Sequence, residues 1–142
     1  MDATLKEVNL KKSIKKFFVD GLPGRELNFD KILTPDIVSS ETIQWVSVLL
    51  EGGNLDTVSE MTMSVYLFTR KDKEGFDLSA FSDEVIENLL YDGTMDLFNT
   101  AVTPWAKIGG VDLHILDNTS GDAPDNTKMK SIQVLLKWTA KW

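Results

Sequence analysis

The sequence predicts one α+β domain, in which a mixed, mostly antiparallel and twisted sheet with long hairpin strands is packed by two main helices. Three observations predict this class. Several segments alternate apolar and polar residues with period two, which is typical of half-buried strands. Two other segments repeat apolar residues every three or four positions, as amphipathic helices do. The length of 142 residues, without an evident linker, fits a single domain spanning 1–142.

Both helices have recognisable ends. We expect the first from Ala3 to Val19, stopped by the glycines and proline of Asp20–Gly24. Its predicted buried face holds five apolar residues, Leu5, Val8, Ile14, Phe17 and Phe18. We expect the second helix to be capped by Asp77 and to end at Asp92-Gly93. Its apolar positions are Leu78, Phe81, Val85 and Leu89.

The central strands carry the clearest pattern. After a short extended piece at Glu26–Leu33, the run Ile43–Leu50 is apolar enough for a strand buried on both faces. Glu51–Asn54 is expected to form a turn into Thr57–Arg70, where Met61, Met63, Val65 and Leu67 share one face. Fourteen extended residues reach roughly 46 Å, against a radius of gyration of about 14–15 Å for a globule of this size. This strand must therefore coil or project.

The C-terminal half is predicted to be mainly β. Extended segments are expected at Met95–Asn99, Val111–Leu116 and Met129–Thr139, the last with Ile132, Val134, Leu136 and Trp138 on one face. Between the last two strands, Asp117–Thr127 contains polar, small and helix-breaking residues. We expect it to form a long, mobile and acidic hairpin loop.

Composition narrows the function. The chain has no cysteine, which excludes a disulfide framework, a thiolate zinc site and a cysteine nucleophile. A net charge of −7 disfavours wholesale or sequence-specific nucleic-acid binding, and no segment is long and apolar enough to suggest a membrane partner. Residues 1–20 carry a local charge of +2, with five lysines against three acids. A basic element on an acidic body could dock on an acidic neighbour.

No residue set qualifies as a catalytic or metal centre. His114 is the single histidine and shares a strand face with Asp112, so a carboxylate-oriented base is conceivable, but a half-exposed strand residue is the simpler interpretation. Asp117, Asp122 and Asp125 offer oxygen ligands for calcium, yet their spacing does not match an EF-hand loop. We therefore expect no enzyme activity, no metal and no cofactor.

Three groups of residues are candidates for subunit or partner contacts. The first is a basic face on the first helix, consisting of Lys11, Lys12, Lys15 and Lys16. An ordinary solvated face, or a membrane contact aided by Phe17-Phe18, are the alternatives for this group. The second consists of Trp105 and Trp142, the two tryptophans that are expected at the surface. The other two, Trp45 and Trp138, stand in predicted strands and are expected in the core. The third consists of the acids of the Asp117–Thr127 segment, Asp117, Asp122 and Asp125.

This order of elements resembles the tail-terminator and tail-completion proteins of tailed bacteriophages, which join the tail to the head. The similar features are an N-terminal helix, the hairpin of Ile43–Leu50 with Thr57–Arg70, a helix after Arg70-Lys71-Asp72, and closing strands through Trp138. The resemblance covers most of the chain, but it depends on the pattern of elements and not on a signature motif. No residue role carries over.

The resemblance implies a non-enzymatic virion protein, assembled in the host cytoplasm and located at the tail or neck. Copies of the chain would close into a ring, six-fold in the family, with the tail tube protein on one side and the head–tail connector protein on the other. DNA could pass through such a ring. Another neck or connector subunit, or a small non-catalytic binding module, are the alternatives.

Overall fold

The computed structural model describes residues 2–91, 93–123 and 126–140. It contains a six-stranded sheet in the order β1-β2-β3-β6-β5-β4, antiparallel except where β1 runs parallel to β2. The strands are β1 (Leu27–Phe29), β2 (Gln44–Asn54), β3 (Val58–Thr69), β4 (Thr94–Asn99), β5 (Ala106–Ala123) and β6 (Thr127–Thr139). The predicted α+β class with a mixed, mostly antiparallel sheet is confirmed.

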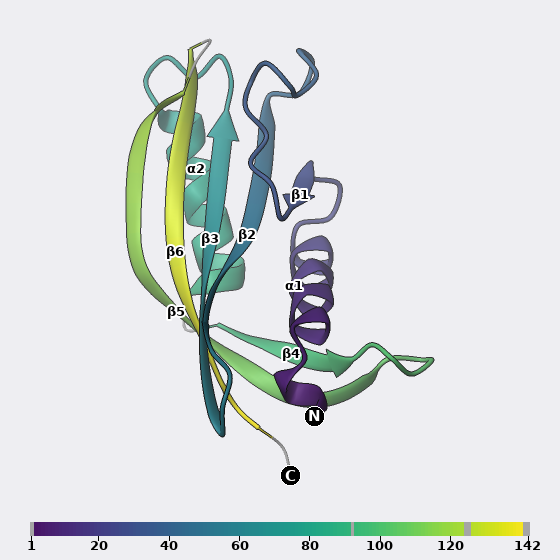
Figure 1. Ribbon diagram of the computed structural model, residues 1–142. Helices are drawn as coiled ribbons and strands as arrows, with labels where there is room; N and C mark the ends of the chain where they lie inside the picture. The colour runs from purple at the N-terminus through teal and green to yellow at the C-terminus, as the bar shows by residue number, and fades with distance from the viewer. Residues whose placement is uncertain (1, 92, 124–125, 141–142) are drawn as a thin grey trace.

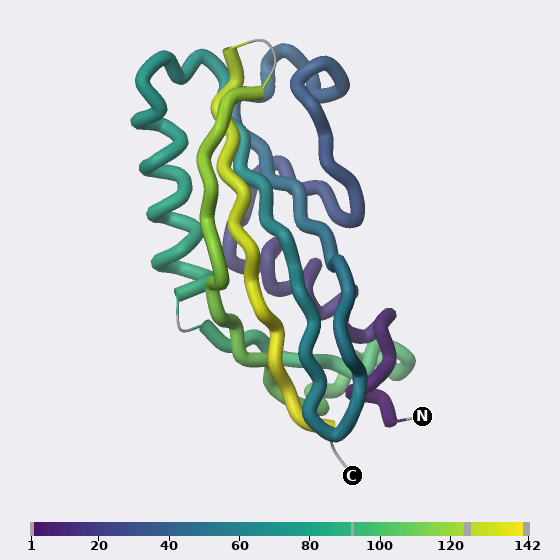
Figure 2. The backbone as a smooth tube through the Cα atoms, turned by 60° about the vertical axis from the view of Figure 1, so that its left-hand side comes forward, coloured from purple at the N-terminus to yellow at the C-terminus, as the bar shows by residue number. Residues whose placement is uncertain are grey.

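Two main helices pack on this sheet. A short 3₁₀ turn, η1 (Ala3–Leu5), precedes α1 (Glu7–Gly21), and α2 (Phe76–Val85) continues into a single π-helical turn, η2 (Ile86–Leu90). The sheet bends sharply, so that β4 and the start of β5 turn out beneath α1 while α2 lies behind β3 and β6 (Figure 1). Figure 2 shows the long strands from the face that carries neither helix. The predicted long strand therefore fits the domain because the sheet coils.

The main core lies between the helices and the concave face of the sheet. The predicted apolar face of β3 is fully engaged there, since Met63, Val65 and Leu67 are completely buried and Met61 nearly so. The four predicted core residues of β6 face the same cluster, namely Ile132, Val134, Leu136 and Trp138. Burial at about 25 cal/mol per Å² of apolar surface makes this cluster the main stabilising feature.

A second, smaller cluster lies on the outer face of the sheet. The Trp45 ring stacks on the Phe68 ring at 5.0 Å between centroids, and Val38 packs against both. Val38 belongs to the segment 30–43, which crosses the outer face between β1 and β2. This cover explains why β2 is buried on both faces from Trp45 to Val48, as the sequence predicted. Ile43 was expected in the same buried strand, but it precedes β2 and is 54% exposed.

The buried face of α1 differs from the expected one. Val8 is 52% exposed, whereas the polar Asn9 is buried together with Ser13. The Asn9 side-chain oxygen accepts a hydrogen bond from the Thr100 backbone N–H at 3.1 Å, and Ser13 Oγ accepts one from the Phe98 N–H at 2.9 Å. These polar side chains tie α1 to the end of β4 and to the residue just after it. Because these buried positions are polar, the apolar periodicity could not reveal which face of the helix is buried.

The predicted cap of α2 is also wrong. Asp77 lies inside the first helical turn, and the buried carboxylate of Asp72 accepts hydrogen bonds from the backbone N–H groups of Asp77 at 3.2 Å and Leu78 at 2.8 Å. The chain from Asp72 passes through Gly75, whose φ of 77° lies in the left-handed region that glycine tolerates. Asp72 can therefore satisfy the free helix-terminal donors although it is five residues away from the first of them.

Two expected turns are strands. Glu51–Asn54 continues β2 past an irregularity in the β2–β3 register between Leu50 and Gly52. At Gly53, an added Cβ would stand 2.0 Å from the Glu60 backbone oxygen, so this glycine permits the close approach of the two strands. Most of the expected Asp117–Thr127 loop is the end of β5, paired with β6 up to Ala123.

The β5 extension could not be predicted because its residues show no alternation. A bulge at Leu116 separates the β5 pairs Ile115↔Val134 and Asp117↔Gln133, so a single residue of β5 has no partner on β6. Beyond this bulge every residue from Leu116 to Asp122 is exposed. Backbone pairing with β6, together with the ion pair between Asp122 and Lys128, holds this end of β5 in the sheet.

Candidate functional site

Three of the four predicted lysines line one groove at the edge of the sheet. It lies between α1 and the concave side of β2 and has a volume of about 170 Å³. Its lining consists of Lys11, Lys12, Ile14, Lys15, Phe29, Asp30, Val48 and Leu50. We call this the α1–β2 groove. Its floor is apolar and its rim is basic.

The lysines of the α1–β2 groove differ in their contacts. Lys11 Nζ lies 2.6 Å from Asp30 Oδ2 and 3.6 Å from Glu7 Oε1, and the hydrogen bond to Asp30 raises the pKa of Lys11. Lys15 Nζ stands over the Phe29 ring at 5.8 Å from its centroid. Neither Lys12 nor Lys15 forms an ion pair with any described residue. These two ammonium groups are available to an acidic partner.

Lys16 and Trp105 are brought together elsewhere. Lys16 Nζ is 2.6 Å from Asp20 Oδ2 and 5.9 Å from the centroid of the Phe98 ring. Phe98 in turn packs against Trp105 at 6.2 Å between ring centroids, and Trp105 is 41% exposed. The predicted basic face is therefore divided between two sides of α1, with one side next to the turn between β4 and β5.

Two of the three predicted acids, Asp117 and Asp122, lie on β5 and not in the expected loop. Asp117 is an exposed residue of the strand next to the unpaired Leu116, which is 55% exposed. Asp122 forms an ion pair with Lys128 on β6 at 2.7 Å. Asp125 and Trp142 lie outside the described residues. From His114 to Ala123, β5 pairs with β6 alone among the described strands, so its outer edge is open.

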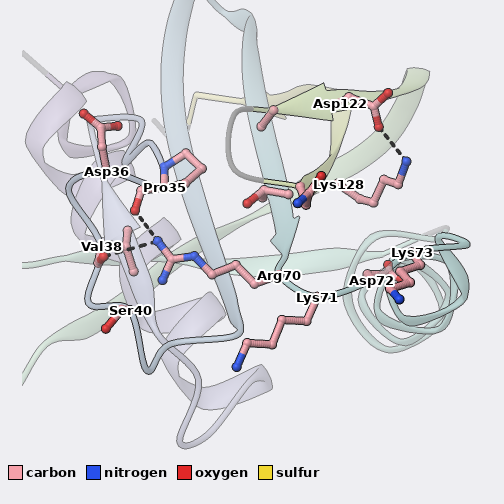
Figure 3. Close-up of a pocket in the computed structure, with 13 residues that line it drawn as sticks. Pro35, Asp36, Val38, Ser40, Arg70, Lys71, Asp72, Lys73, Asp122 and Lys128 are labelled. Carbon is pink, nitrogen blue, oxygen red and sulfur yellow. Dashed lines mark hydrogen bonds and ion pairs between the residues drawn. The ribbon is translucent and has the colours of Figure 1, made fainter.

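A large cleft at one end of the sheet was not predicted. Figure 3 shows residues from three separate segments around it, and its volume is about 1010 Å³. The described residues around it come from 35–40, from 70–73, and from the end of β5 with the start of β6 (122–123 and 126–128). They contribute four cations, Arg70, Lys71, Lys73 and Lys128, and three acids, Asp36, Asp72 and Asp122. We call this the end cleft. No local sequence motif could reveal this cleft, because its residues are far apart in the sequence and come together only when the sheet forms.

Arg70 stabilises one wall of the end cleft. Its guanidinium stands over the Trp45 ring at 5.0 Å and donates hydrogen bonds to backbone carbonyls of the 35–42 segment. The accepting oxygens belong to Pro35, Val38, Ser39 and Thr42. Arg70 therefore holds this segment in place through several carbonyls at once.

Among the described residues, no catalytic arrangement of side chains surrounds His114. His114 and Asp112 are exposed on the outer face, opposite the buried Val111 and Leu113, as the strand alternation predicted. Within residues 2–91, 93–123 and 126–140, no group of three or more His, Asp or Glu side chains is arranged to hold a metal ion. No described helix is long and apolar enough to span a membrane.

Comparison with known proteins gives a structural match alone. No protein-family description and no curated protein sequence matches this chain. One solved structure, of a protein whose name states no function, superposes with a TM-score of 0.57 at 8% sequence identity. The match covers 100% of this chain and 97% of the other. At this identity the likeness defines a shared fold of one whole domain.

Proposed function

We propose that this chain is a structural subunit of a homo-oligomeric ring, built of six copies, at the head-proximal end of a phage tail. The ring would stop growth of the tail tube and join the tail to the head connector. The observation that carries the proposal is the end of β5, where Leu116–Asp122 is exposed throughout and its outer edge pairs with no described strand. The resemblance in element order supplies the biological setting.

An open strand edge favours assembly because its N–H and C=O groups can pair with another chain. This sheet has a second open edge on its other flank. There β1 covers β2 only at Val46–Val48, so the β2 residues beyond Val48 pair with β3 on one side and with no described strand on the other. Different surfaces on opposite flanks are what a heterologous contact requires, and such contacts generate closed rings when the rotation closes.

The two ends of the molecule would meet the other tail proteins. Ile37, Ile43 and Phe76 have exposed apolar side chains and stand in the sequence within or close to the segments that line the end cleft. At the opposite end, near the β2–β3 and β4–β5 turns, Val58, Val102 and Trp105 are exposed (Figure 1). These separate patches suit two different partners, the tail tube protein and the connector protein.

Electron microscopy and light scattering of the purified chain test the proposal. We expect a ring with a central opening and a mass of about 95 kDa, six times the 15.9 kDa of one chain. A chain that stays monomeric at high concentration, and also fails to bind the ends of phage tail tubes, would refute it. A ring of another symmetry would indicate a neighbouring neck or connector subunit.

The end cleft favours one alternative, a small non-catalytic binding module. Its volume of about 1010 Å³ is in the range of ligand-binding sites, and charged groups of both signs line it. A ligand screen by thermal shift separates the two functions. Stabilisation of a monomer by a small molecule, lost in Lys73→Glu and Lys128→Glu variants, would favour the binding module over the ring.

A further inference from the structure

The end of the β2–β3 hairpin, residues 55–60, has the properties of a contact surface. It forms the lower tip of the sheet in Figures 1 and 2, beyond the last residue of β2. Its two large apolar side chains, Leu55 and Val58, are 41% and 47% exposed. Apolar side chains exposed on one projecting element are candidates for burial against a partner. We call residues 55–60 the hairpin end.

Two acidic residues flank Val58. Glu60 lies two positions further along β3, and the burial of the residues that alternate with them places both side chains on the outer face of the sheet. Asp56 lies two positions before Val58, in the turn, and is also exposed. Glu60 Oε1 is 3.7 Å from Lys137 Nζ on β6, and the same cross-strand row continues to Asp112 on β5. The hairpin end therefore combines an apolar side chain with negative charge.

The α1–β2 groove offers a complementary shape. Its floor is apolar and is formed by Ile14, Phe29, Val48 and Leu50. Its volume of about 170 Å³ is close to that of apolar cavities that hold a benzene molecule, about 150 Å³. A valine side chain has fewer carbon atoms than benzene and fits this space.

The rim of the groove offers a complementary charge. Lys11, Lys12 and Lys15 line it, and Lys11 is already engaged with Asp30 and Glu7. The ammonium groups of Lys12 and Lys15 form no ion pair with any residue that the structure describes. Carboxylates brought to this rim would gain cationic partners. Complementary charge at a contact suppresses wrong pairings and fixes the register.

A copy cannot place its hairpin end in its own groove. Leu50 in the groove pairs with Met63 of β3, and Val58 lies five residues further along that strand, roughly 17 Å away. The pairing of Val58 with Thr139 on β6 holds it there. The two surfaces also lie on opposite faces of the sheet, since Leu50 packs against the main core. A hairpin end that fills the groove therefore belongs to a second copy.

We propose that the groove of one copy receives the hairpin end of the next copy, an inference that rests on the proposed ring. Val58 enters the groove, while Asp56 and Glu60 meet Lys12 and Lys15 on its rim. The contact joins two different surfaces. Each copy can therefore give its hairpin end to one neighbour and its groove to the other, as a closed ring requires.

The contact involves both flanks of the sheet. The groove borders the open edge of β2, and the acidic surface beside the hairpin end reaches β5 at Asp112. Val102 and Trp105, on the turn between β4 and β5, take no part in the contact. These two side chains stay exposed for a tail partner at this end of the molecule.

Charge-reversal variants test the contact in the full-length chain. Asp56→Lys/Glu60→Lys and Lys12→Glu/Lys15→Glu should each raise the concentration at which the ring forms by roughly tenfold or more. An equal mixture of the two should restore assembly, because copies can alternate around a six-membered ring and every contact then joins opposite charges. Failure of the mixture to assemble would overturn the contact.

Lys71→Glu/Lys73→Glu is the matched control for these variants. It makes the same change of charge as the groove variant, but in the end cleft. Its ring should form at the concentration that the natural sequence needs. An equal loss of assembly in this control would show that net charge, and not the groove, governs the contact.

Cysteine cross-linking gives an independent test, because the chain contains no cysteine of its own. In a Val58→Cys/Leu50→Cys variant the two thiols of one copy are too far apart for an internal disulfide. Mild oxidation should therefore link copies into a ladder of up to six on a non-reducing gel. The matched control is Val58→Cys/Phe76→Cys, whose second thiol replaces a 72% exposed residue at the start of α2.

The outcomes separate the two proposals. If the natural sequence forms a ring, then no ladder from the first cysteine pair, a single dimer band, or an equal ladder from the control pair would each overturn this contact and leave the ring proposal intact. A chain that remains monomeric with and without tail tubes would overturn the ring itself, and the contact with it. Circular dichroism of each variant shows whether a loss of assembly reflects loss of the fold.

Discussion

At the scale of single residues, Asp72 shows how a buried charge can stabilise this fold. It is 4% exposed, and its carboxylate accepts hydrogen bonds from Thr69 Oγ1 at 2.9 Å and from the backbone of α2. Burial by itself raises the pKa of Asp72, but the hydrogen bonds from Leu78, Thr69 and Asp77 outweigh it and hold the pKa below its usual range. The ionised form is therefore the one that the folded state favours.

This lowered pKa predicts the pH dependence of a variant. Asp72→Asn should lower the free energy of unfolding by about 1–2 kcal/mol at pH 7, because a charged cap and acceptor is lost. The folded-state pKa lies below the unfolded value of about 3.9, so the advantage is present above that pH and disappears as pH falls through the folded pKa. Urea unfolding of both proteins from pH 7 to pH 3 should show the gap closing.

Asp77→Asn is the matched control for this experiment. Asp77 is an exposed residue of the same helical turn, so its replacement should leave stability nearly unchanged at both ends of the pH range. A gap between the Asp72 variant and the natural sequence that stays constant with pH would contradict a stabilising role of the charge.

Residue-scale prediction from the sequence succeeded where burial follows alternation. The apolar faces of β3 and β6 were predictable because every second residue is apolar and enters one core. Asn9 and Ser13 were not predictable, since they bind the backbone donors of Thr100, just after β4, and of Phe98, at its end, which are 91 and 85 residues away in sequence. Asp72 was missed for a related reason, because it caps α2 although it does not stand directly before the helix.

At the scale of elements, the 30–43 segment is held by Arg70, the residue that follows β3, together with hydrogen bonds between Leu33 and β2. Arg70 binds four carbonyls spread along the segment and stacks on Trp45. The segment itself contains only turns and bends. Segments with few backbone hydrogen bonds open locally more easily than the core. The anchor should therefore control local opening more than global stability.

Limited proteolysis can measure this local control. In Arg70→Gln the carbonyls lose most of their donors, and we expect trypsin to cleave after the exposed Lys31 several-fold faster than in the natural sequence. Lys73→Gln removes the same charge from the end cleft without touching the carbonyls, and serves as the control. Equal cleavage rates in the two variants would show that the charge, and not the hydrogen bonds, matters.

The presence or absence of an apolar face explains which elements could be predicted from the sequence. The helices and the alternating strands were found because each has an apolar face, whereas the end of β5 has none. Its strand structure comes from the long partner β6 and from the bulge at Leu116, both of which are properties of the pair. The candidate lysines and acids were found as charged surface residues, but their placement on opposite flanks depends on the coiling of the sheet.

For the whole molecule, assembly and stability should be linked. If the ring forms, unfolding also requires dissociation, so the midpoint temperature must rise with protein concentration. A tenfold rise in concentration adds about 1 kcal/mol per subunit, or about 2–5 °C for a domain of this size. Differential scanning fluorimetry over a hundredfold concentration range measures this slope. The Leu116→Asp variant should show no slope, and a natural sequence without one would contradict assembly.

The open edges of β2 and β5 also bear on how such a protein can change over generations. A strand edge presents backbone N–H and C=O groups, which nearly every amino acid carries, so a contact made through it requires few particular side chains. Substitutions can then accumulate along both strands while the pairing persists. The solved structure that superposes on this chain shows how little sequence identity a shared fold requires, since only 8% of the residues are identical.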